Sequence, residues 1–482
     1  MAEDESFGID PMMSWYWNLL LGTLRLDTVS LIPNSSHEPL HANLQLELGN
    51  KPTHFAAPVL HLFGFFWRIL LAWRHPGKPL PTSEPGLIHF IGFSSNQIAS
   101  LSPIQSQLSS RCPSVLWTRE SFRRLLFWAY PLSLPFLPCL LYRWLTSRGY
   151  RRTSFRWSTD DYWLNYGLYL VWRCWLRRTS PSSVLIGNDH VQMSCVLAVA
   201  ARDEGIPTWY VQHACVTEAF PPLTTDYALL DGVDAAEKYA AAGPSSTKVF
   251  LVGIGKFDAF SARVRTSQQF QNLGICFSMA DSLDRSQELL EALAKHSVSR
   301  RVAVTARPHP RMSPASIEQL KRSADEFGFA WSEPSVESSF DFLCRQDVMI
   351  CGLSAIALEA ALVNVVPLNY QLNLEHTDWY GFIRNGLTRS TDDVQGLLEW
   401  LEEFEVSGTP PVRHRAMRYC ATINSRWDGH SAELAALVIE ATLQADASNS
   451  LDSLGMRLAP IGTLSVYGMA EDSSDATKSA QN

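Results

Sequence analysis

Four short segments carry the residues with which this chain could do chemistry, and each follows directly on an apolar run. They are GNDH at 187–190, VQHACVTEAFPP at 211–222, TARPHP at 305–310 and CGLSAIALEAAL at 351–362. Their order along the chain is more informative than any one of them.

The first two segments supply candidates for catalysis. His213 comes right after a short strand-like run, where a neutral imidazole could take a proton from an attacking hydroxyl. Asp189 or His190, at the end of another such run, could contact an acceptor sugar. Other interpretations stay open, because an Asn-Asp pair before a helix is equally a cap and a histidine in this place can be purely structural.

The TARPHP segment supplies candidates for binding an anionic group. Its two prolines restrict the backbone around His309 and hold that side chain in one place. Arg307 and Arg311 flank the histidine, and a guanidinium group is suited to bidentate contact with phosphate. A rigid surface turn is the alternative interpretation.

The fourth segment predicts a strand, a turn of small residues and a helix. Ser354 and the free amides that open the helix would form a position for an anion, at the positive end of the helix dipole. Glu359, five residues further on, could reach a ribose hydroxyl. An exposed helix carboxylate is the alternative for Glu359.

Bringing these residues together requires a parallel α/β sheet, and the sequence predicts two of them. From about residue 181, short apolar runs alternate with helical ones, which is typical of parallel sheets. The first series has strands at 183–189, 208–214, 226–232 and 248–255, with helices at 191–205 and 234–243. The second has strands at 273–280, 301–310, 347–354 and 365–370, with helices at 286–296, 316–328 and 355–363. In such sheets ligands sit at the carboxyl ends of the strands.

A connection between the two series is expected at 257–270, a segment of weak strand character. The fold prediction is therefore α/β, with two doubly wound, Rossmann-like domains facing a cleft. Residues 1–256, with an aromatic-rich N-terminal extension, are assigned to the first domain and 271–445 to the second. Residues 446–482, rich in Ser, Asp and Gly, are predicted to be a disordered tail.

Length and composition fit this organisation. With 482 residues, of which 46% are hydrophobic and 18% charged, the chain has material for two cores. A net charge of −8 gives no overall footprint for nucleic acid. The nine cysteines are scattered, with no CxxC pair, which argues against a zinc site and favours a reducing compartment. The acidic start MAEDESFGID does not resemble a signal peptide, so a cytoplasmic location is expected.

The region 111–178 differs from the rest of the chain. It holds twelve arginines, no lysine, three acidic residues and seven tryptophans. This mixture suits an anionic membrane surface, on whose inner face the protein would be peripheral, while packing of the tryptophans inside a domain is the alternative. The apolar stretch 125–145 contains three prolines, which argues against a simple transmembrane helix, and 57–73 is expected to be a buried or interfacial helix.

Taken in order, these motifs resemble those of bacterial GT-B glycosyltransferases of surface-polysaccharide synthesis. The motifs are GNDH, GIPTWYVQHA, FPPLTTDYALLDG, the VGIGKFD strand, RPHP, the stretch from Ser354 to NVVPL and NSRWDGHSAELAALV. The most similar groups are polysialyltransferase-like and CDP-glycerol glycerophosphotransferase-like enzymes, over residues 183–440. The chain departs from them at Ala214, where glycine is usual, and at Gly352-Leu353-Ser354, where a serine pair is usual.

The resemblance implies a transferase that needs no metal and no cofactor beyond its nucleotide-activated donor. It also implies that the first domain is the acceptor-side domain and the second the nucleotide-donor-binding domain. Under it, Arg307, His309 and Ser354 hold the donor phosphate and His213 is the general base, with Asp189 the second catalytic candidate. The acceptor would be a glycan or a lipid-linked sugar, in the synthesis of a capsule or another cell-envelope polysaccharide. A nucleotide-sugar 2-epimerase and a non-catalytic GT-B scaffold are the alternatives; an epimerase usually has an arginine soon after the first histidine, and none occurs between His213 and Asp258.

Overall fold

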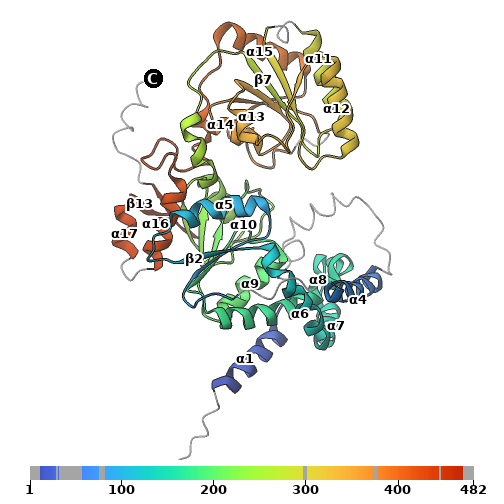
Figure 1. Cartoon of the computed structure of the whole chain (residues 1–482), viewed down its shortest axis with the longest axis vertical. Helices are drawn as coiled ribbons and strands as arrows, with labels where there is room; N and C mark the ends of the chain where they lie inside the picture. The colour runs from blue at the N-terminus through green and yellow to red at the C-terminus, as the bar shows by residue number, and fades with distance from the viewer. Residues whose placement is uncertain are drawn as a thin grey trace, which may run out of the picture.

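The computed structural model describes residues 11–28, 31, 57–74, 82–296, 301–373, 377–443 and 447–469. Two parallel β-sheets form the centres of two domains, one from each half of the chain (Figure 1). The central strands of both sheets, such as β1, β3, β10 and β11, are short and buried on both faces, as expected where helices cover a parallel sheet on two sides.

The sheet of the N-terminal domain has eight strands in the order β13-β14-β6-β5-β4-β3-β1-β2. All neighbouring pairs are parallel except β13 and β14. Its first six strands are β1 (Ile88–Gly92), β2 (Ser114–Thr118), β3 (Ser183–Ile186), β4 (Thr208–Val211), β5 (Tyr227–Leu230) and β6 (Lys248–Leu251). The associated helices include α5 (Ser95–Gln107), α9 (Gln192–Asp203) and α10 (Val233–Ala242).

The C-terminal domain has a six-stranded sheet in the order β12-β11-β10-β7-β8-β9, with every pair parallel. Its strands are β7 (Asn272–Cys276), β8 (Ala303–Arg307), β9 (Ala330–Trp331), β10 (Val348–Cys351), β11 (Val366–Tyr370) and β12 (Arg389–Thr391). Its helices are α11 (Leu283–Lys295), α12 (Pro314–Glu326), α13 (Ser339–Leu343), α14 (Ile356–Leu362) and α15 (Val394–Ser407).

The strands and helices predicted between residues 183 and 255 and between 273 and 370 are confirmed, with shifts of a few residues at their ends. The segment 257–270, expected to connect the two series, does lie between β6 and β7, and its first part belongs to a 3-10 helix at Gly255–Arg263. The sequence missed β1 and β2, which lie in the part of the chain that looked irregular and aromatic. The N-terminal sheet therefore begins at Ile88.

The tail prediction is wrong for residues 447–469. This segment forms α17 (Ala447–Ser453) and the hairpin of β13 (Met456–Ile461) and β14 (Leu464–Met469). β14 pairs in parallel with β6, and its residues Leu464 and Val466 are buried. The segment is therefore ordered despite its polar composition, because the apolar side chains at alternate positions of β14 are buried when this strand pairs with the edge of β6. The last part of the predicted tail, 470–482, lies outside the described residues.

Helix α16 (Ser431–Leu443) also belongs with the N-terminal domain rather than within the C-terminal assignment of 271–445. It packs against α5 and against the 3-10 helix that follows β6. Its Leu434 and Ile439 share a buried cluster with Trp209 and Phe250 of the N-terminal sheet. The chain thus crosses into the C-terminal domain and returns.

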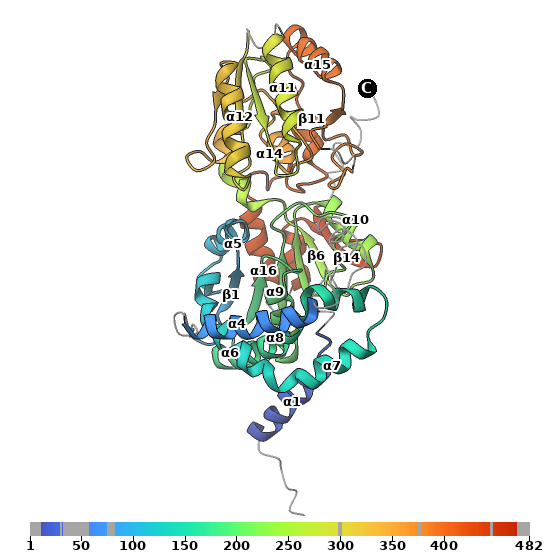
Figure 2. The ribbon, with the colours of Figure 1, turned by 90° about the vertical axis from the view of Figure 1, so that its right-hand side faces the viewer.

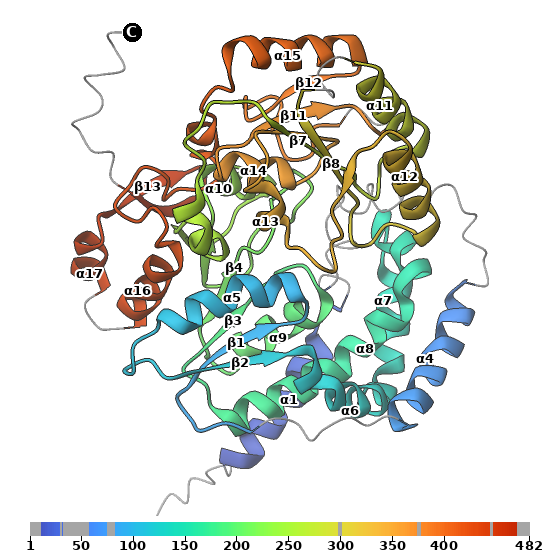
Figure 3. The same cartoon turned by 45° about the horizontal axis from the view of Figure 1, so that its top comes forward.

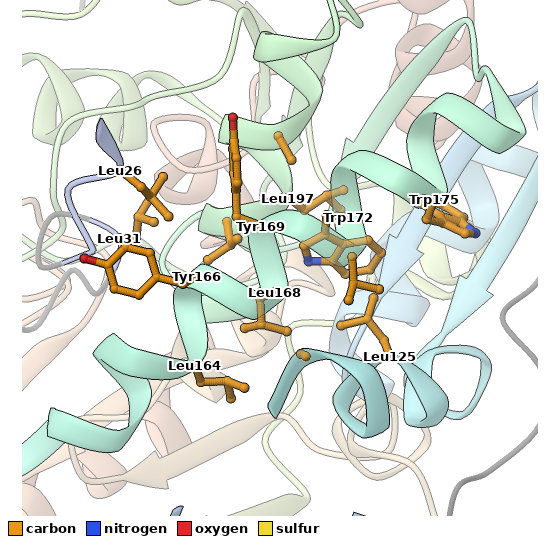
Figure 4. Close-up of a cluster of buried hydrophobic side chains, with 14 of the residues drawn as sticks. Leu26, Leu31, Leu125, Leu164, Tyr166, Leu168, Tyr169, Trp172, Trp175 and Leu197 are labelled. Carbon is orange, nitrogen blue, oxygen red and sulfur yellow. The ribbon is translucent and has the colours of Figure 1, made fainter. Parts of the chain in front are cut away.

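The aromatic-rich extension is a helical layer built around α8 (Tyr150–Thr179). The other helices are α1 (Pro11–Arg25), α4 (Ala57–Arg74), α6 (Arg123–Ser133) and α7 (Leu137–Thr146), and Figure 3 shows α4, α6, α7 and α8 grouped beside the N-terminal sheet. Trp172 and Trp175 of α8 are buried near Leu125 and Leu197 (Figure 4). Interior packing, the alternative expectation for these tryptophans, therefore holds for part of the region.

One helical run among the described residues, Arg119–Thr146, is long and apolar enough to cross a membrane by length and composition alone. The core helix of a soluble protein passes the same test, and 35% of the apolar window is buried here. The run is not one straight helix, since a 3-10 turn at Leu134–Phe136 separates α6 from α7. The prolines that argued against a simple spanning helix lie in and around this turn.

Candidate functional site

Each sheet has one place where the strand order reverses, and this place is where ligands bind in open α/β sheets. In the N-terminal domain it lies between β1 and β3, because later strands follow β3 on one side and β2 follows β1 on the other. In the C-terminal domain it lies between β7 and β10. The loops after these strands hold Asp189, which follows β3, and Ser354, which follows β10, whereas His213 and His309 follow the neighbouring strands β4 and β8.

His213 lies two residues beyond the end of β4 and is held against two neighbouring side chains. The Asn188 amide nitrogen is 3.4 Å from Nε2 of His213 and 3.5 Å from Nε2 of His190. An amide nitrogen can only donate, so both Nε2 atoms accept and the ring proton of each neutral histidine sits on Nδ1. The atom of His213 able to take a further proton is Nε2.

The environment of His213 keeps its ring uncharged at neutral pH. Burial, followed by the neighbouring His190 and the Lys256 ammonium, lowers the pKa of His213 to about 4. Its Nδ1 atom is buried and has no hydrogen-bond partner among the described residues. His89 combines the same low pKa with an unpaired Nδ1, so what distinguishes His213 is the group of strand-end residues gathered around it.

The backbone of His213 is fixed by two other loops. The Asn96 side chain at the start of α5 donates to the carbonyl of His213 over 2.9 Å, and Lys256 Nζ lies 3.3 Å from the same oxygen. Asn96 follows β1 and Lys256 follows β6. The site thus takes residues from the ends of β1, β3, β4 and β6.

Asp189 occupies a supporting position. Its carboxylate is buried, with 2% of the side chain exposed, and accepts from His190 Nδ1 over 2.9 Å. The structure therefore pairs Asp189 with His190 and not with His213. Asp189 orients His190, which in turn lies beside His213.

Lys256 connects this cluster to the C-terminal domain. Its charge opposes the effect of burial on two carboxyl groups, Asp231 at the end of β5 and Glu359 on α14. Burial raises the pKa of Asp231 well above its usual value and also raises that of Glu359. The predicted residue Glu359 thus lies within the electrostatic reach of the N-terminal cluster.

A pocket opens at the carboxyl ends of β4, β5 and β6. Its cavity volume is only about 10 Å³, and its polar lining includes Gln212, Asp231 and Lys256. The Gln212 side chain accepts from the backbone of Asp231 over 2.9 Å, which fixes one wall. The lining residue Gln212 directly precedes His213 in the sequence.

Arg307 is placed differently from the prediction that it grips a phosphate. It is buried at the end of β8, where Nη1 donates to Ser332 Oγ over 2.6 Å and Nη2 donates to the Glu337 carbonyl over 2.8 Å. The guanidinium also lies over the ring of Phe342. Both terminal nitrogens are therefore used to hold the loop after β9.

His309 lies in the turn between β8 and α12. Its Nδ1 accepts from the Arg311 amide over 3.1 Å, which leaves Nε2 as the second ring nitrogen. Burial, followed by the Arg311 charge, lowers the pKa of His309. A pocket of about 220 Å³ opens beside this turn, lined among others by Asp281, Arg311 and Ser313.

Ser354 sits at the reversal point of the C-terminal sheet, just before α14, and a carboxyl group lies close to the nearby Gly352. Helix α14 has only 7 residues, so its dipole is short. The Asp281 carboxylate accepts from the backbone and hydroxyl of Ser278, and a Cβ on Gly352 would lie 2.6 Å from it. A negative group already stands next to the predicted position.

The closing motif NSRWDGHSAELAALV binds the two halves of the chain together. The Asp258 carboxylate of VGIGKFD accepts from the backbone of Ser431 and Ala432, which caps the start of α16. Asp428 makes a bidentate ion pair with Arg413, with both distances 2.6 Å. These two motifs, far apart in sequence, are thus held together by hydrogen bonds near the point where the chain passes between the domains.

The sequence did not single out Lys256 or Asn96. Lys256 stands directly after a predicted strand, and this position could have indicated that it lies near the other residues at strand ends. Asn96 follows β1, which was not recognised as a strand, so no sequence signal placed it near His213.

Comparison with solved structures defines the fold. A putative UDP-N-acetylglucosamine 2-epimerase from Listeria monocytogenes has a TM-score of 0.50 and 12% sequence identity, over 74% of this chain and 96% of that one. The fold is GT-B-like. UDP-GlcNAc 2-epimerase from Neisseria meningitidis, solved bound to UDP-GlcNAc, has a TM-score of 0.48 with 12% identity, over 74% and 99% of the two chains. MurG from Acinetobacter baumannii has a TM-score of 0.42 with 12% identity, over 73% and 99%.

No family model and no curated protein sequence matches the chain. The structural likeness therefore concerns the GT-B-like fold, and the reaction has to be argued from the site.

Proposed function

We propose that this protein is a metal-independent glycosyltransferase that moves a sugar, or a polyol phosphate, from a nucleotide-activated donor to a glycan or lipid-linked acceptor. The observation that carries the proposal is the His213 ring, whose lowered pKa keeps it neutral and whose Nε2 is the atom that can take a proton. A base of this kind has a use where an acceptor hydroxyl must lose its proton. A synthesis of cell-surface polysaccharide is the proposed setting.

In the transfer, the acceptor oxygen attacks the carbon that carries the donor phosphate. Its proton passes to His213 Nε2, a bond forms between the acceptor oxygen and that carbon, and the carbon–oxygen bond to the phosphate breaks. The nucleotide leaves with the electron pair. For a polyol phosphate the same steps occur at the phosphorus atom instead of the carbon.

The leaving nucleotide gains negative charge, which cations stabilise. Lys256 on the N-terminal side and Arg311 beside the C-terminal pocket are the cations offered for this purpose. His309 stays proposed as a donor contact through Nε2, with Ser354 and Glu359 as further donor-binding residues. Arg307 is proposed to shape this region by holding the loop after β9 in place.

A nucleotide-sugar 2-epimerase is the second candidate, because the fold is similar to that of a putative UDP-N-acetylglucosamine 2-epimerase. An epimerase changes the sugar within one bound nucleotide and needs no acceptor. The segment from His213 to Asp258 has no arginine, which favours the transferase.

The first experiment is a thermal-shift panel with CMP, CDP, UDP and GDP. A ligand at 100 times its dissociation constant should stabilise the protein by about 2.7 kcal/mol, so the nucleotide that raises the melting temperature identifies the donor class. The donor with that nucleotide is then incubated with and without candidate acceptors. Nucleotide release that depends on an acceptor supports the transferase, whereas interconversion of the donor sugar without an acceptor supports the epimerase.

A further inference from the structure

The exposed large apolar side chains of this protein are concentrated on the helices of its N-terminal extension. Among the described residues, nineteen of the twenty-five lie on α1, on α4 and on the run 123–146 that contains α6 and α7. The other six are scattered singly over the rest of the chain. Scattered apolar side chains are normal on a surface, but a concentration of this size marks an interaction site.

We call the exposed apolar side chains of α1, α4 and the run 123–146 the apolar face. Figures 1 and 2 both place these helices at the end of the molecule away from the C-terminal domain. Arg143 of α7 donates to the carbonyls of Arg25 and Leu26, which ties α7 to the end of α1. The apolar face is thus presented by helices that are attached to one another.

Helix α4 shows how firmly this face is turned outward. Its His61 lies 3.0 Å from the buried carboxylate of Asp160 on α8, and Arg68 forms an ion pair with the same carboxylate. On the other side of the helix, Phe63 is 70% exposed and Trp67 is 62% exposed. His61 and Arg68 are thus anchored to the protein while Phe63 and Trp67 face away from it, although Phe65 of the same helix is buried against the domain.

The charges of these helices all have one sign. Helices α1, α4, α6 and α7 contain six arginines and no lysine, aspartate or glutamate. Seven of the nineteen exposed apolar side chains are tryptophan or tyrosine. Arginine together with amphipathic aromatic rings is the composition of a surface that lies in the headgroup layer of a bilayer.

We infer that the apolar face docks this protein on an anionic lipid bilayer, lying in the interface without crossing it. Tryptophan, leucine and phenylalanine side chains enter the boundary of the acyl chains, and the arginines meet lipid phosphates. A second copy of the chain fits less well, because the helices that present the apolar face contain six arginines and no acidic residue of their own, so two such faces would bring like charges together.

This surface differs from the one expected from the sequence. The Trp/Arg region 111–178 was predicted to meet the membrane, but Trp163, Trp172 and Trp175 are buried in it. Only its α6–α7 part belongs to the apolar face, and α1 and α4 lie outside the region altogether.

The test is flotation of the full chain with two kinds of vesicle, one of phosphatidylcholine and one of an equal mixture of phosphatidylcholine and phosphatidylglycerol. The wild type should float with the mixed vesicles and largely stay behind with the neutral ones. A variant with Phe63→Ser and Trp67→Ser should lose roughly a hundredfold in partition coefficient. Its control is Val336→Ser with Val406→Ser, which removes two similarly exposed apolar side chains from the C-terminal domain and should change nothing.

The contribution of the arginines to membrane binding is tested with a second pair of variants, one on a helix of the apolar face and one in the C-terminal domain. Arg123 of α6 pairs with the exposed Glu120, and Arg322 of α12 pairs in the same way with Glu318. Arg123→Gln should weaken binding to mixed vesicles roughly fivefold, whereas Arg322→Gln should leave it unchanged. Equal loss in both variants would overturn the role of the arginines.

Three results would overturn the docking surface itself. The first is that the wild type floats with neither kind of vesicle. The second is that the Phe63/Trp67 variant floats as the wild type does. The third is that light scattering shows an oligomeric wild type and a monomeric Phe63/Trp67 variant, with no change in flotation. The last result would assign the face to a second copy of the chain. Flotation needs no nucleotide, so its outcome is independent of the proposed transfer reaction.

Discussion

The N-terminal and C-terminal sides of the site were predicted from the same kind of signal, polar residues at strand ends, yet they are built differently. On the N-terminal side, loops after four strands converge on His213, and its ring keeps a buried nitrogen without a partner. On the C-terminal side, Arg307 already uses both terminal nitrogens and Asp281 stands beside Gly352. A position at a strand end therefore does not decide whether a side chain is available to a ligand.

What decides availability is the set of partners that the fold supplies. His213 lies among groups that repel its charged form, so its ring stays neutral; its basic nitrogen, Nε2, is 3.4 Å from the Asn188 amide, and its Nδ1 has no partner among the described residues. Arg307 is surrounded by acceptors, so its donors are consumed in the protein. This contrast between an available base and an occupied cation can be tested residue by residue.

The largest expected effect is that of His213→Ala. Loss of the general base should reduce kcat by about 10²- to 10⁴-fold, while the thermal shift caused by the nucleotide remains. His309→Ala is the counterpart on the C-terminal side and should weaken nucleotide binding. Full transfer activity in His213→Ala would move the role of base elsewhere, and Asp231 is the next residue to examine.

The next largest effect distinguishes the structural role expected for Arg307 from the nucleotide-binding role proposed for Arg311. Arg307→Ala leaves Ser332 and the Glu337 carbonyl without their donor in a buried place, so it should lower the free energy of unfolding by about 2 to 3 kcal/mol. Arg311→Ala should leave urea unfolding nearly unchanged and weaken the nucleotide-induced shift. If Arg307→Ala unfolds like the wild type but no longer binds nucleotide, Arg307 is a ligand after all.

The third effect is the dependence of stability on pH. Burial lowers the pKa of both His213 and His89 to about 4. Between pH 4 and the unfolded value near 6.5, the unfolded chain binds protons that the folded chain does not, so the free energy of unfolding falls as the pH is lowered through this window. From pH 7 to pH 5 the loss should be roughly 2 kcal/mol per histidine.

Urea unfolding at the two pH values measures this loss. In His213→Ala the difference between pH 7 and pH 5 should shrink, since one of the two histidines is gone. His309 is less deeply buried, so His309→Ala should retain most of the difference. An identical pH dependence in His213→Ala and the wild type would contradict the buried neutral state of His213.

The smallest effect concerns Lys256, the charge that links the two sides. The Lys256 ammonium contributes to the low pKa of His213, but burial is the larger cause. In Lys256→Met the pKa of His213, followed by NMR of the ring protons, should rise by less than about one unit. A rise to the ordinary value of histidine would mean that the cation and not burial controls the ring, and no rise at all would place Lys256 too far away to act on it.

Much of this structure was readable in the sequence, for identifiable reasons. The alternation from residue 183 to 370 has regular apolar periods, and these predicted the strands, the helices and the two sheets. The position of His213 followed from one such strand. The strands β1 and β2 were missed because the aromatic helices around them obscure that alternation, and with β1 the residue Asn96 was missed too.

The hairpin of β13 and β14 shows a second reason why part of the fold could not be predicted from the sequence. Its composition is that of a tail, and its order comes from pairing with β6, more than 200 residues earlier in the chain. A contact of this kind has no local signal, because the edge that it covers exists only once the N-terminal sheet has formed.

By itself, the sequence determined which residues stand at the ends of strands, since local periodicity and short polar turns set those places. The tertiary structure alone decided what each of those residues can do. Burial and the choice of partners keep His213 neutral, occupy Arg307 and pair Asp189 with His190. It also decided which tryptophans lie in the core and which aromatic rings face outward on α4, because both α4 and α8 are rich in aromatic residues and the exposure of each ring depends on what packs against it.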